Sequence, residues 1–351
     1  MNSNAPLYNG IEVDMLSLGD ADSILVTNWV KGVPQRVLID GGNKEDSEKI
    51  CQFLLQRGAR HIDNVVCSHP HDDHAAGLVE IIGCKHLTFG HAWMHLPWQH
   101  IDQRALANAL AQSKASRVVR IIYASLQTQK AILKAIQSRG IPLSEPFKGQ
   151  HVGFMFTCSP SKEYYEELLK EFSDLEKLER FEEALVAHER SLMVEEFWKG
   201  TIVGGKASES KESGVIGGAP TEPENNSATV LFTKWGNDQC LFTSDAGVPA
   251  LDRVKNAYAL ANLRWLQIPH HGSRRNINHD LIRYFAPEIA YVSSNGDKKH
   301  PRRAVVNAFK EVRTKVFSTH YPNDTNLWFH LGQVPERLEY SAATALYEAD
   351  K

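Results

Sequence analysis

The sequence has few cysteines, no long apolar run and no excess of charge of one sign, and each absence excludes a class of protein. Its five cysteines are scattered and never form a C-x-x-C pair, so we expect buried free thiols and no disulfide framework. No stretch approaches the roughly 18 apolar residues of a membrane span. Residues 1–10 lack the basic and apolar regions of a secretory signal, so we expect a cytoplasmic protein without a membrane partner.

The charge is nearly balanced, with a formal net value of -3 over 351 residues, and gives no global attraction to nucleic acid. Any polyanion would have to bind at a local basic patch. With 42% hydrophobic residues, the chain can bury a large core. We expect residues 1–351 to form a single domain.

The first part of the chain alternates between short apolar runs and a helical pattern. Residues 12–18, 23–27 and 37–39 are bounded by Gly, Asp or Pro, as strands are, and we interpret them as a β-meander. Residues 47–57 place apolar side chains on one helical face, and 64–67 form the next strand. Ligands of α/β sheets collect at the carboxyl ends of such strands, and a His/Asp cluster follows this one directly.

A similar alternation of strands and helices returns after residue 228. The expected strands are 229–233, 239–243, 265–268, 289–293 and 315–317, and the expected helices are 250–263, 281–285 and 304–312. Two halves with similar secondary structure are typical of two sheets that face each other. We therefore predict an α/β fold with two sheets that face each other.

The middle of the chain, residues 85–226, has a weaker pattern. We interpret it as a helix-rich insertion that ends in a flexible loop over residues 204–226, which are rich in Gly, Ser, Glu and Pro. Residues 162–198 are highly charged but carry apolar residues at helical spacings. This pattern favours the solvated face of a long helix over a binding surface, although the segment is also a candidate site for a protein partner.

Candidate chemistry is concentrated in residues 68–74, Ser-His-Pro-His-Asp-Asp-His, which follow a strand and lead into a helix. His69 and His71 can aim at one ion, while Asp73 and His74 can turn toward a second. Imidazole and carboxylate ligands suit zinc, with manganese possible where oxygen ligands are numerous. A lone His-x-His would more often be structural or solvated, but four ligand-type residues at a strand end predict a metal site.

Two strand ends in the second half offer further ligands. Asp245 follows residues 239–243, and taken alone it would be a helix N-cap, whereas beside the cluster its carboxylate could bridge two cations. His270 and His271 follow residues 265–268 in the same way. Adjacent histidines point in different directions, so we expect only one of them to ligate.

These segments, in this order, resemble the metallo-β-lactamase superfamily, and most of all the hydrolase domain of ComEC-type competence proteins and their phosphorylcholine-esterase relatives. Residues 16–23 (LSLGDADS) and 38–42 (LIDGG) resemble that group's VGQGD and LIDAG segments. Residues 225–227 (NNS), 243–245 (TSD) and 269–273 (PHHGS) resemble its NNxS, TGD and HHGS motifs. The resemblance implies a four-layer αββα sandwich and a metal-dependent hydrolase with two divalent ions, zinc or manganese.

The resemblance also implies a role for each matching residue. His69 and His71 would bind the first metal, and Asp73 and His74 would bind the second. Asp245 would be the carboxylate that bridges the two ions.

The remaining roles are less uniform among relatives. His271 is assigned to the second metal because many relatives read Pro-x-His-Gly there, and His270 would then lie behind the ligands. Asp40 would hydrogen-bond the ligands or adjoining loops, or else only fix the turn before residues 41–42. Many members contribute a further histidine to the first metal, and no clear motif for it exists here. The candidates, each also interpretable as an ordinary packing or polar residue, are His95, His151 and His188.

The implied reaction is hydrolysis by a hydroxide that two cations share. Asp73 could orient the nucleophile or move a proton, and His300, in a segment like the family's GHPH, is a candidate general acid, a phosphate contact or a surface residue. Ser273 and Arg274 lie beside the site in sequence, and the basic segment 298–303 would return to the same rim. Such an anion patch favours a phosphodiester substrate, and nucleic acid is the natural long polyanion.

We therefore hypothesise a metal-dependent phosphodiesterase that acts as a nuclease. Two alternatives stay open. One is a hydrolase of a small phosphodiester, such as a phosphocholine ester or a signalling nucleotide. The other is a regulatory or binding module of a defence or competence system with a structural metal site, and the missing histidine motivates it.

Overall fold

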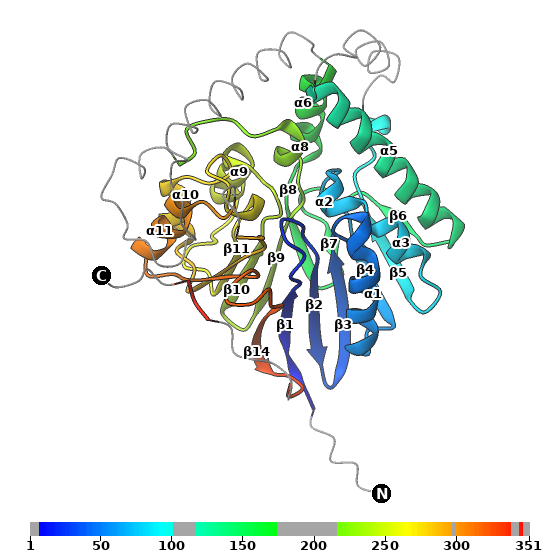
Figure 1. Ribbon diagram of the computed structural model, residues 1–351, viewed down its shortest axis with the longest axis horizontal. Coiled ribbons are helices and arrows are strands. Elements are labelled where there is room, and N and C mark those ends of the chain that lie inside the picture. Colours follow the sequence, from blue (N-terminus) through cyan, green and yellow to red (C-terminus); the bar gives the residue numbers. More distant parts are fainter. Residues whose placement is uncertain (1–6, 101–116, 174–215, 297–299, 338–343, 347–351) are drawn as a thin grey trace, which may run out of the picture.

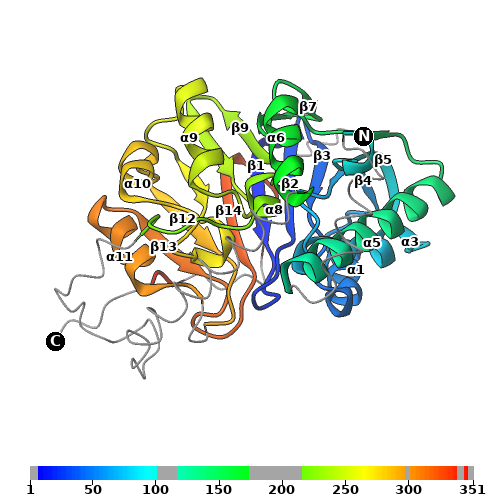
Figure 2. The same ribbon diagram turned by 90° about the horizontal axis from the view of Figure 1, so that it is seen from above.

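The computed structural model describes residues 7–100, 117–173, 216–296, 300–337 and 344–346. In these ranges the chain folds into two seven-stranded sheets that lie face to face, with helices on both outer sides (Figures 1 and 2). The predicted α/β fold, with two sheets between layers of helices, is confirmed.

The first sheet is built mainly from the amino-terminal half. Its strands, in order, are β14 (Leu327–Gln333), β1 (Asn9–Met15), β2 (Ile24–Val30), β3 (Val33–Ile39), β4 (His61–Val66), β5 (Thr88–Trp93) and β6 (Leu143–Ser144). Strands β1 to β3 form the expected antiparallel meander, and β3 to β6 run parallel. The helices α1 (Ser47–Gln56), α3 (Leu78–Gly83) and α5 (Arg117–Ser138) pack apolar side chains on its outer face.

The second sheet comes mainly from the carboxyl-terminal half. Its strands, in order, are β13 (Lys315–Ser318), β12 (Ile289–Val292), β11 (Trp265–Gln267), β10 (Asp238–Phe242), β9 (Val230–Trp235), β8 (Met155–Ser159) and β7 (His151–Val152). The helices α9 (Val248–Ala257), α10 (His279–Phe285) and α11 (Arg303–Glu311) cover its outer face. Strands β10 to β13 are parallel, so their carboxyl ends lie at one edge.

Residues 85–226 contribute to both sheets, because β5 and β6 pair in the first sheet and β7 and β8 in the second. The remaining short helices are α2 (Asp72–Ala75), α6 (Lys162–Ser173) and α8 (Pro223–Asn226), with 3-10 turns at Lys44–Asp46, Pro97–Gln99 and His270–Gly272. Helix α8 lies in the segment expected to be a flexible loop, and all its residues are buried. Of the candidate partner segment 162–198, only α6 falls within the described residues.

Besides the cores under the outer helices, a third core lies between the sheets. Because successive side chains of a strand point to opposite faces, Ile11, Val13 and Met15 of β1 all reach the second sheet, where they join Phe242 and Trp265. The five cysteines are unpaired, as expected, and three of them are buried. No helix within the described ranges has the length and apolar character needed to cross a bilayer.

Candidate metal centre

The segment after β4 carries the first candidate ligands. His71 is the N-cap of α2, and its backbone oxygen accepts the amides of His74 (3.1 Å) and Ala75 (2.8 Å). The amide of Gly41 donates to the oxygen of His74 at 2.7 Å, and a Cβ on Gly77 would lie 2.0 Å from the oxygen of Gly41. Only glycine at position 77 allows this close approach, which fixes α2 against the end of β3.

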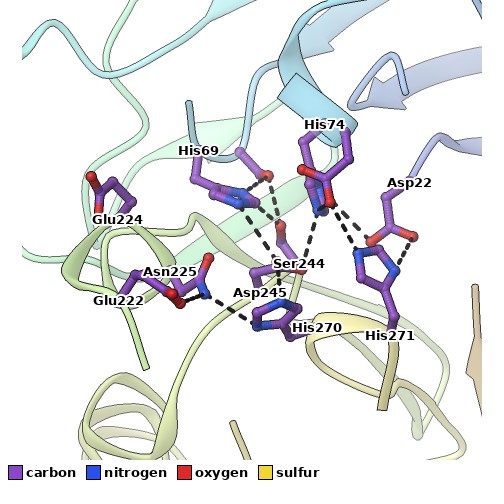
Figure 3. A network of polar contacts seen from close by, with 12 residues as sticks. Asp22, His69, His74, Glu222, Glu224, Asn225, Ser244, Asp245, His270 and His271 are labelled. Atoms are coloured by element: carbon purple, nitrogen blue, oxygen red, sulfur yellow. Dashed lines mark hydrogen bonds and ion pairs between the residues drawn. The ribbon is translucent and has the colours of Figure 1, made fainter. Parts of the chain in front are cut away.

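Two groups of potential ligands meet at this edge of the sheets (Figure 3). In the first group, Asp245 Oδ1 lies 3.2 Å from His74 Nε2, and Asp245 Oδ2 lies 3.7 Å from His69 Nε2. In the second group, Asp73 Oδ2 lies 3.4 Å from His271 Nε2 and 4.0 Å from His74 Nε2. His74 is common to both groups, so the structure brings together ligands from β4, β10 and β11 that the sequence places far apart.

The chemistry of these groups fits divalent cations. Buried polar atoms in proteins almost always have a hydrogen-bond partner. Here a set of buried ligand atoms has none in the structure: Nε2 of His69, His71, His74 and His271, and both carboxylate oxygens of Asp245. Nitrogen and oxygen donors that converge in this way are typical of a zinc or manganese site.

Asp40 holds His74 from behind. Its carboxylate accepts hydrogen bonds from the Ser68 amide (2.7 Å), the Ser68 hydroxyl (2.6 Å) and His74 Nδ1 (2.9 Å). The backbone of Asp40 is left-handed (φ 62°), a conformation that Asp tolerates better than most residues. With Nδ1 donating to Asp40, the Nε2 of His74 is directed at Asp245 and Asp73.

The surroundings of His74 and His69 shift the pKa values of these two side chains in opposite directions. Burial lowers the pKa of His74, but the carboxylates of Asp245 and Asp73 outweigh it and hold that pKa well above its ordinary value. Burial, together with the charge of His74, holds the pKa of His69 well below its ordinary value. His69 is therefore a neutral donor, and His74 carries the positive charge that the surrounding carboxylates require when no cation is present.

A second supporting carboxylate, Asp22, was missed by the sequence analysis. His271 Nδ1 lies 3.0 Å from the hydroxyl of Ser293, and that hydroxyl donates to Asp22 Oδ1. Asp22 Oδ2 accepts from the side chain of Gln267 at 2.8 Å. Burial lowers the pKa of His271, but the nearby carboxylates of Asp73 and Asp22 raise it to about 9. Asp22 lies within the segment 16–23, whose likeness to a family motif was the available signal.

Some of the residues expected on the rim lie beside the turn His270–Gly272. The amide of Ser273 closes the turn on the oxygen of His270 (2.8 Å), and the buried Arg274 follows it. His300 is 5% exposed, and its ring centre lies 5.7 Å from that of His270 and 6.0 Å from that of His271. The neighbouring residues 298 and 299 lie outside the described residues.

The candidates for a further histidine do not join the described ligand groups. His95 packs between the rings of Phe147 and Tyr165, and its Nε2 lies 3.3 Å from the hydroxyl of Thr229. Exposed His151 packs its ring on Phe156. The third candidate, His188, lies outside the described residues.

The Metallo-beta-lactamase superfamily profile matches residues 21–119. The match supports this superfamily for the chain. It includes Asp40 and the whole 68–74 segment, and the two-sheet fold agrees with it. No curated protein sequence matches the chain.

Several solved structures are similar in fold. The metallo-β-lactamase fold protein YhfI from Bacillus subtilis is 9% identical, with a TM-score of 0.44, and the match covers 92% of this chain and 100% of that one. A dizinc quorum-quenching lactonase, AidC, is 14% identical with a TM-score of 0.35, covering 94% and 80%. A long-form RNase Z from yeast is 13% identical with a TM-score of 0.35, covering 84% and 38%. At these values the neighbours' activities do not transfer to this chain.

Glu224 is a further buried carboxyl near the site that the sequence did not reveal. It lies in α8, is 2% exposed, and neither of its oxygens has a hydrogen-bond partner in the structure. Burial raises the pKa of Glu224 to about 7, against a smaller opposing effect of His71. The Gly- and Ser-rich composition around it predicted a loop, and that interpretation concealed the carboxyl.

We expect Glu224→Gln to change how stability depends on pH in the metal-free protein. The folded state holds the proton on Glu224 up to about pH 7, whereas the unfolded chain releases it near 4.5. The protonated Glu224 therefore contributes fully to the free energy of unfolding below pH 4.5. This contribution falls as the pH rises from 4.5 through 7, by at most about 3 kcal/mol in total. Urea unfolding of the wild type and of Glu224→Gln in chelator should show the variant becoming more stable relative to the wild type as the pH rises from 4.5 to 7. A constant difference would contradict the prediction.

Proposed function

We propose that the protein is a metal-dependent phosphodiesterase that cleaves nucleic acid. The observation that carries the proposal is the pair of ligand groups that share His74: His69 and Asp245 lie on one side of it, and Asp73 and His271 on the other. The Nε2 atoms of these histidines and both oxygens of Asp245 are buried without a hydrogen-bond partner. Members of the metallo-β-lactamase superfamily are mostly metal-dependent hydrolases, and the ComEC-type motifs point in the same direction. Divalent ions, when bound, lower the pKa of a coordinated water and neutralise charge on a phosphoryl oxygen.

The chain's own residues supply the remaining steps. Asp73 is 32% exposed at its side chain, whereas Asp245 is fully buried, so Asp73 is the carboxylate that borders both the ligands and the solvent. It orients the attacking water and accepts its proton. His300, buried beside His270 and His271, is placed to donate a proton to the leaving oxygen or to bind the phosphate.

Basic residues near the centre support an anionic substrate. Arg274 lies two residues after the turn His270–Gly272, and the amide of Arg302 donates to the oxygen of Gly272 at 3.1 Å. Arg303 begins α11 next to it. Arg274 and Arg302 thus lie next to the turn His270–Gly272, on a protein whose net charge is -3. A local patch of this kind favours contacts to a phosphate backbone.

The test is a substrate panel with zinc- or manganese-loaded protein. We expect cleavage of single- or double-stranded DNA or RNA that chelator abolishes and that Asp73→Ala lowers by about 100-fold or more. Asp280→Ala, at an exposed position on α10, is the matched control and should keep full activity. No cleavage by the wild type, or equal cleavage by Asp73→Ala, contradicts the proposal.

The same panel includes a chromogenic small phosphodiester. Turnover of that compound without cleavage or binding of polymers would instead favour a small-molecule hydrolase. Stoichiometric metal without any turnover would favour the alternative of a binding module with a structural metal site.

A further inference from the structure

His270 points at the candidate centre and not behind it. Its Nε2 lies 3.6 Å from Asp245 Oδ2, nearly the same distance as that of His69 Nε2 from this oxygen, 3.7 Å. The other oxygen, Oδ1, faces His74 at 3.2 Å. The two oxygens of Asp245 therefore face different sets of imidazoles, and Figure 3 shows His270 and His271 turned to opposite sides of the turn.

The backbone conformation explains how the adjacent residues His270 and His271 face different carboxylates. His270 and His271 both have left-handed conformations, with φ of 49° and 52°, and Gly272 follows with φ of 83°. Such conformations are strained for residues other than glycine and persist where the surroundings enforce them. The sharp turn sends His271 Nε2 toward Asp73 (3.4 Å) and leaves His270 Nε2 at Asp245.

The hydrogen bonds at the far side of the ring fix the tautomer of His270. Asn276 donates its side-chain nitrogen to the backbone oxygen of Asp245 at 2.7 Å, so its Oδ1 faces His270 Nδ1 at 3.1 Å. Asn225 also lies 3.1 Å from this Nδ1, but its amide nitrogen donates to Thr221 (2.8 Å) and Glu222 (3.1 Å). Nδ1 therefore carries the proton and donates to Asn276.

A neutral imidazole of this tautomer presents the lone pair of Nε2 to Asp245. Two electron-rich atoms that face each other at 3.6 Å form no hydrogen bond, since neither carries a proton and the distance is too long. Ligands held about 2.0–2.1 Å from a tetrahedral ion lie about 3.4 Å from one another. The spacings of His69 and His270 from Asp245 Oδ2 are close to that value.

We propose that His270 is the third imidazole ligand of the first metal ion, together with His69 and His71, and that Asp245 Oδ2 completes its coordination. This inference rests on the proposed metal-dependent function. In this arrangement His270, from the turn His270–Gly272, takes the place of the further histidine that many metallo-β-lactamase relatives contribute to the first metal. His271 then binds the second ion together with Asp73 and His74. Among the other candidates for that role, described His95 and His151 both lie in packing contacts.

The experiment uses cobalt as the probe on the full chain. Wild-type protein should bind two Co²⁺ ions, and His270→Ala should bind one of them at least about 100-fold more weakly, with an unchanged melting temperature in chelator. Because loss of a residue behind the ligands can also cost affinity, a second variant is decisive. In His270→Cys the thiolate should reach the ion and produce a sulfur-to-cobalt charge-transfer band, which the wild type lacks.

His95→Cys is the matched control, a buried histidine changed to cysteine away from the ligand groups, and it should show no band. Two tightly bound ions in His270→Ala, fewer than two in the wild type, or no band in His270→Cys would overturn the inference. So would an equal band in the control. These measurements need no turnover. If the protein hydrolyses nothing, only the proposed function is contradicted. If the wild type is active but His270→Cys shows no band, only this inference is contradicted.

Discussion

Asp245→Ala is expected to abolish the binding of both metal ions and to reduce hydrolysis by far more than the ~100-fold that loss of an outer hydrogen-bond partner can cost. The two oxygens of Asp245 face His74 at 3.2 Å and His69 at 3.7 Å, and the carboxylate is completely buried. Its removal takes one negative ligand from each ion and leaves mutually repelling imidazoles around a cavity. Metal content by mass spectrometry and initial rates on a phosphodiester check the two parts separately.

The control for this variant is Asp238→Ala. Asp238 begins β10, the strand that Asp245 follows, and lies at the opposite end of the sheet. It should retain both ions and full activity. An Asp245→Ala protein with two bound ions would show that the carboxylate is not a shared ligand, whatever its activity.

Asp40→Asn is expected to lower metal affinity about 10- to 100-fold and the free energy of unfolding by about 3–5 kcal/mol. Asp40 accepts three hydrogen bonds, from the amide and hydroxyl of Ser68 and from Nδ1 of His74. An amide in its place puts hydrogens against one of these donors. If His74 changes tautomer to accept that hydrogen, its Nε2 becomes protonated and can no longer ligate.

Urea unfolding and metal titration of the Asp40→Asn protein measure the two effects. Asp280→Asn makes the same chemical change at a side chain that is 77% exposed, and should be neutral in both. Wild-type affinity in Asp40→Asn would mean that Asp40 only fixes the turn before residues 41–42, as the alternative interpretation of the sequence had it.

The fold, and the approach of the candidate ligands to one another, were predictable because their signals are local. Alternating apolar runs identified most strands of both sheets, and His69 to His74 stand together directly after β4. Asp245 and His271 follow apolar strands in the same manner, and parallel strands bring their carboxyl ends to one edge. No long-range information was needed to expect these side chains at a common centre.

The direction of His270 was not predictable, because it depends on two successive left-handed residues and on the amide of Asn276. Neither feature has a signature in the order of residues around position 270. Asp22 and Glu224 were missed for a related reason. Their proximity to the site is set by tertiary contacts, such as that of Asp22 with Gln267, 245 residues along the chain.

The candidate centre also joins the two sheets mechanically. Ser68, behind His69, touches the hydroxyl of Ser244, beside Asp245, across 176 residues of chain (2.7 Å). A cation held by His69 and Asp245 would link two points of the chain that are far apart in sequence, as a covalent cross-link does. Such a link lowers the conformational entropy of the chain. Bound ions would therefore hold the two halves of the molecule together, and their removal would let one half unfold without the other.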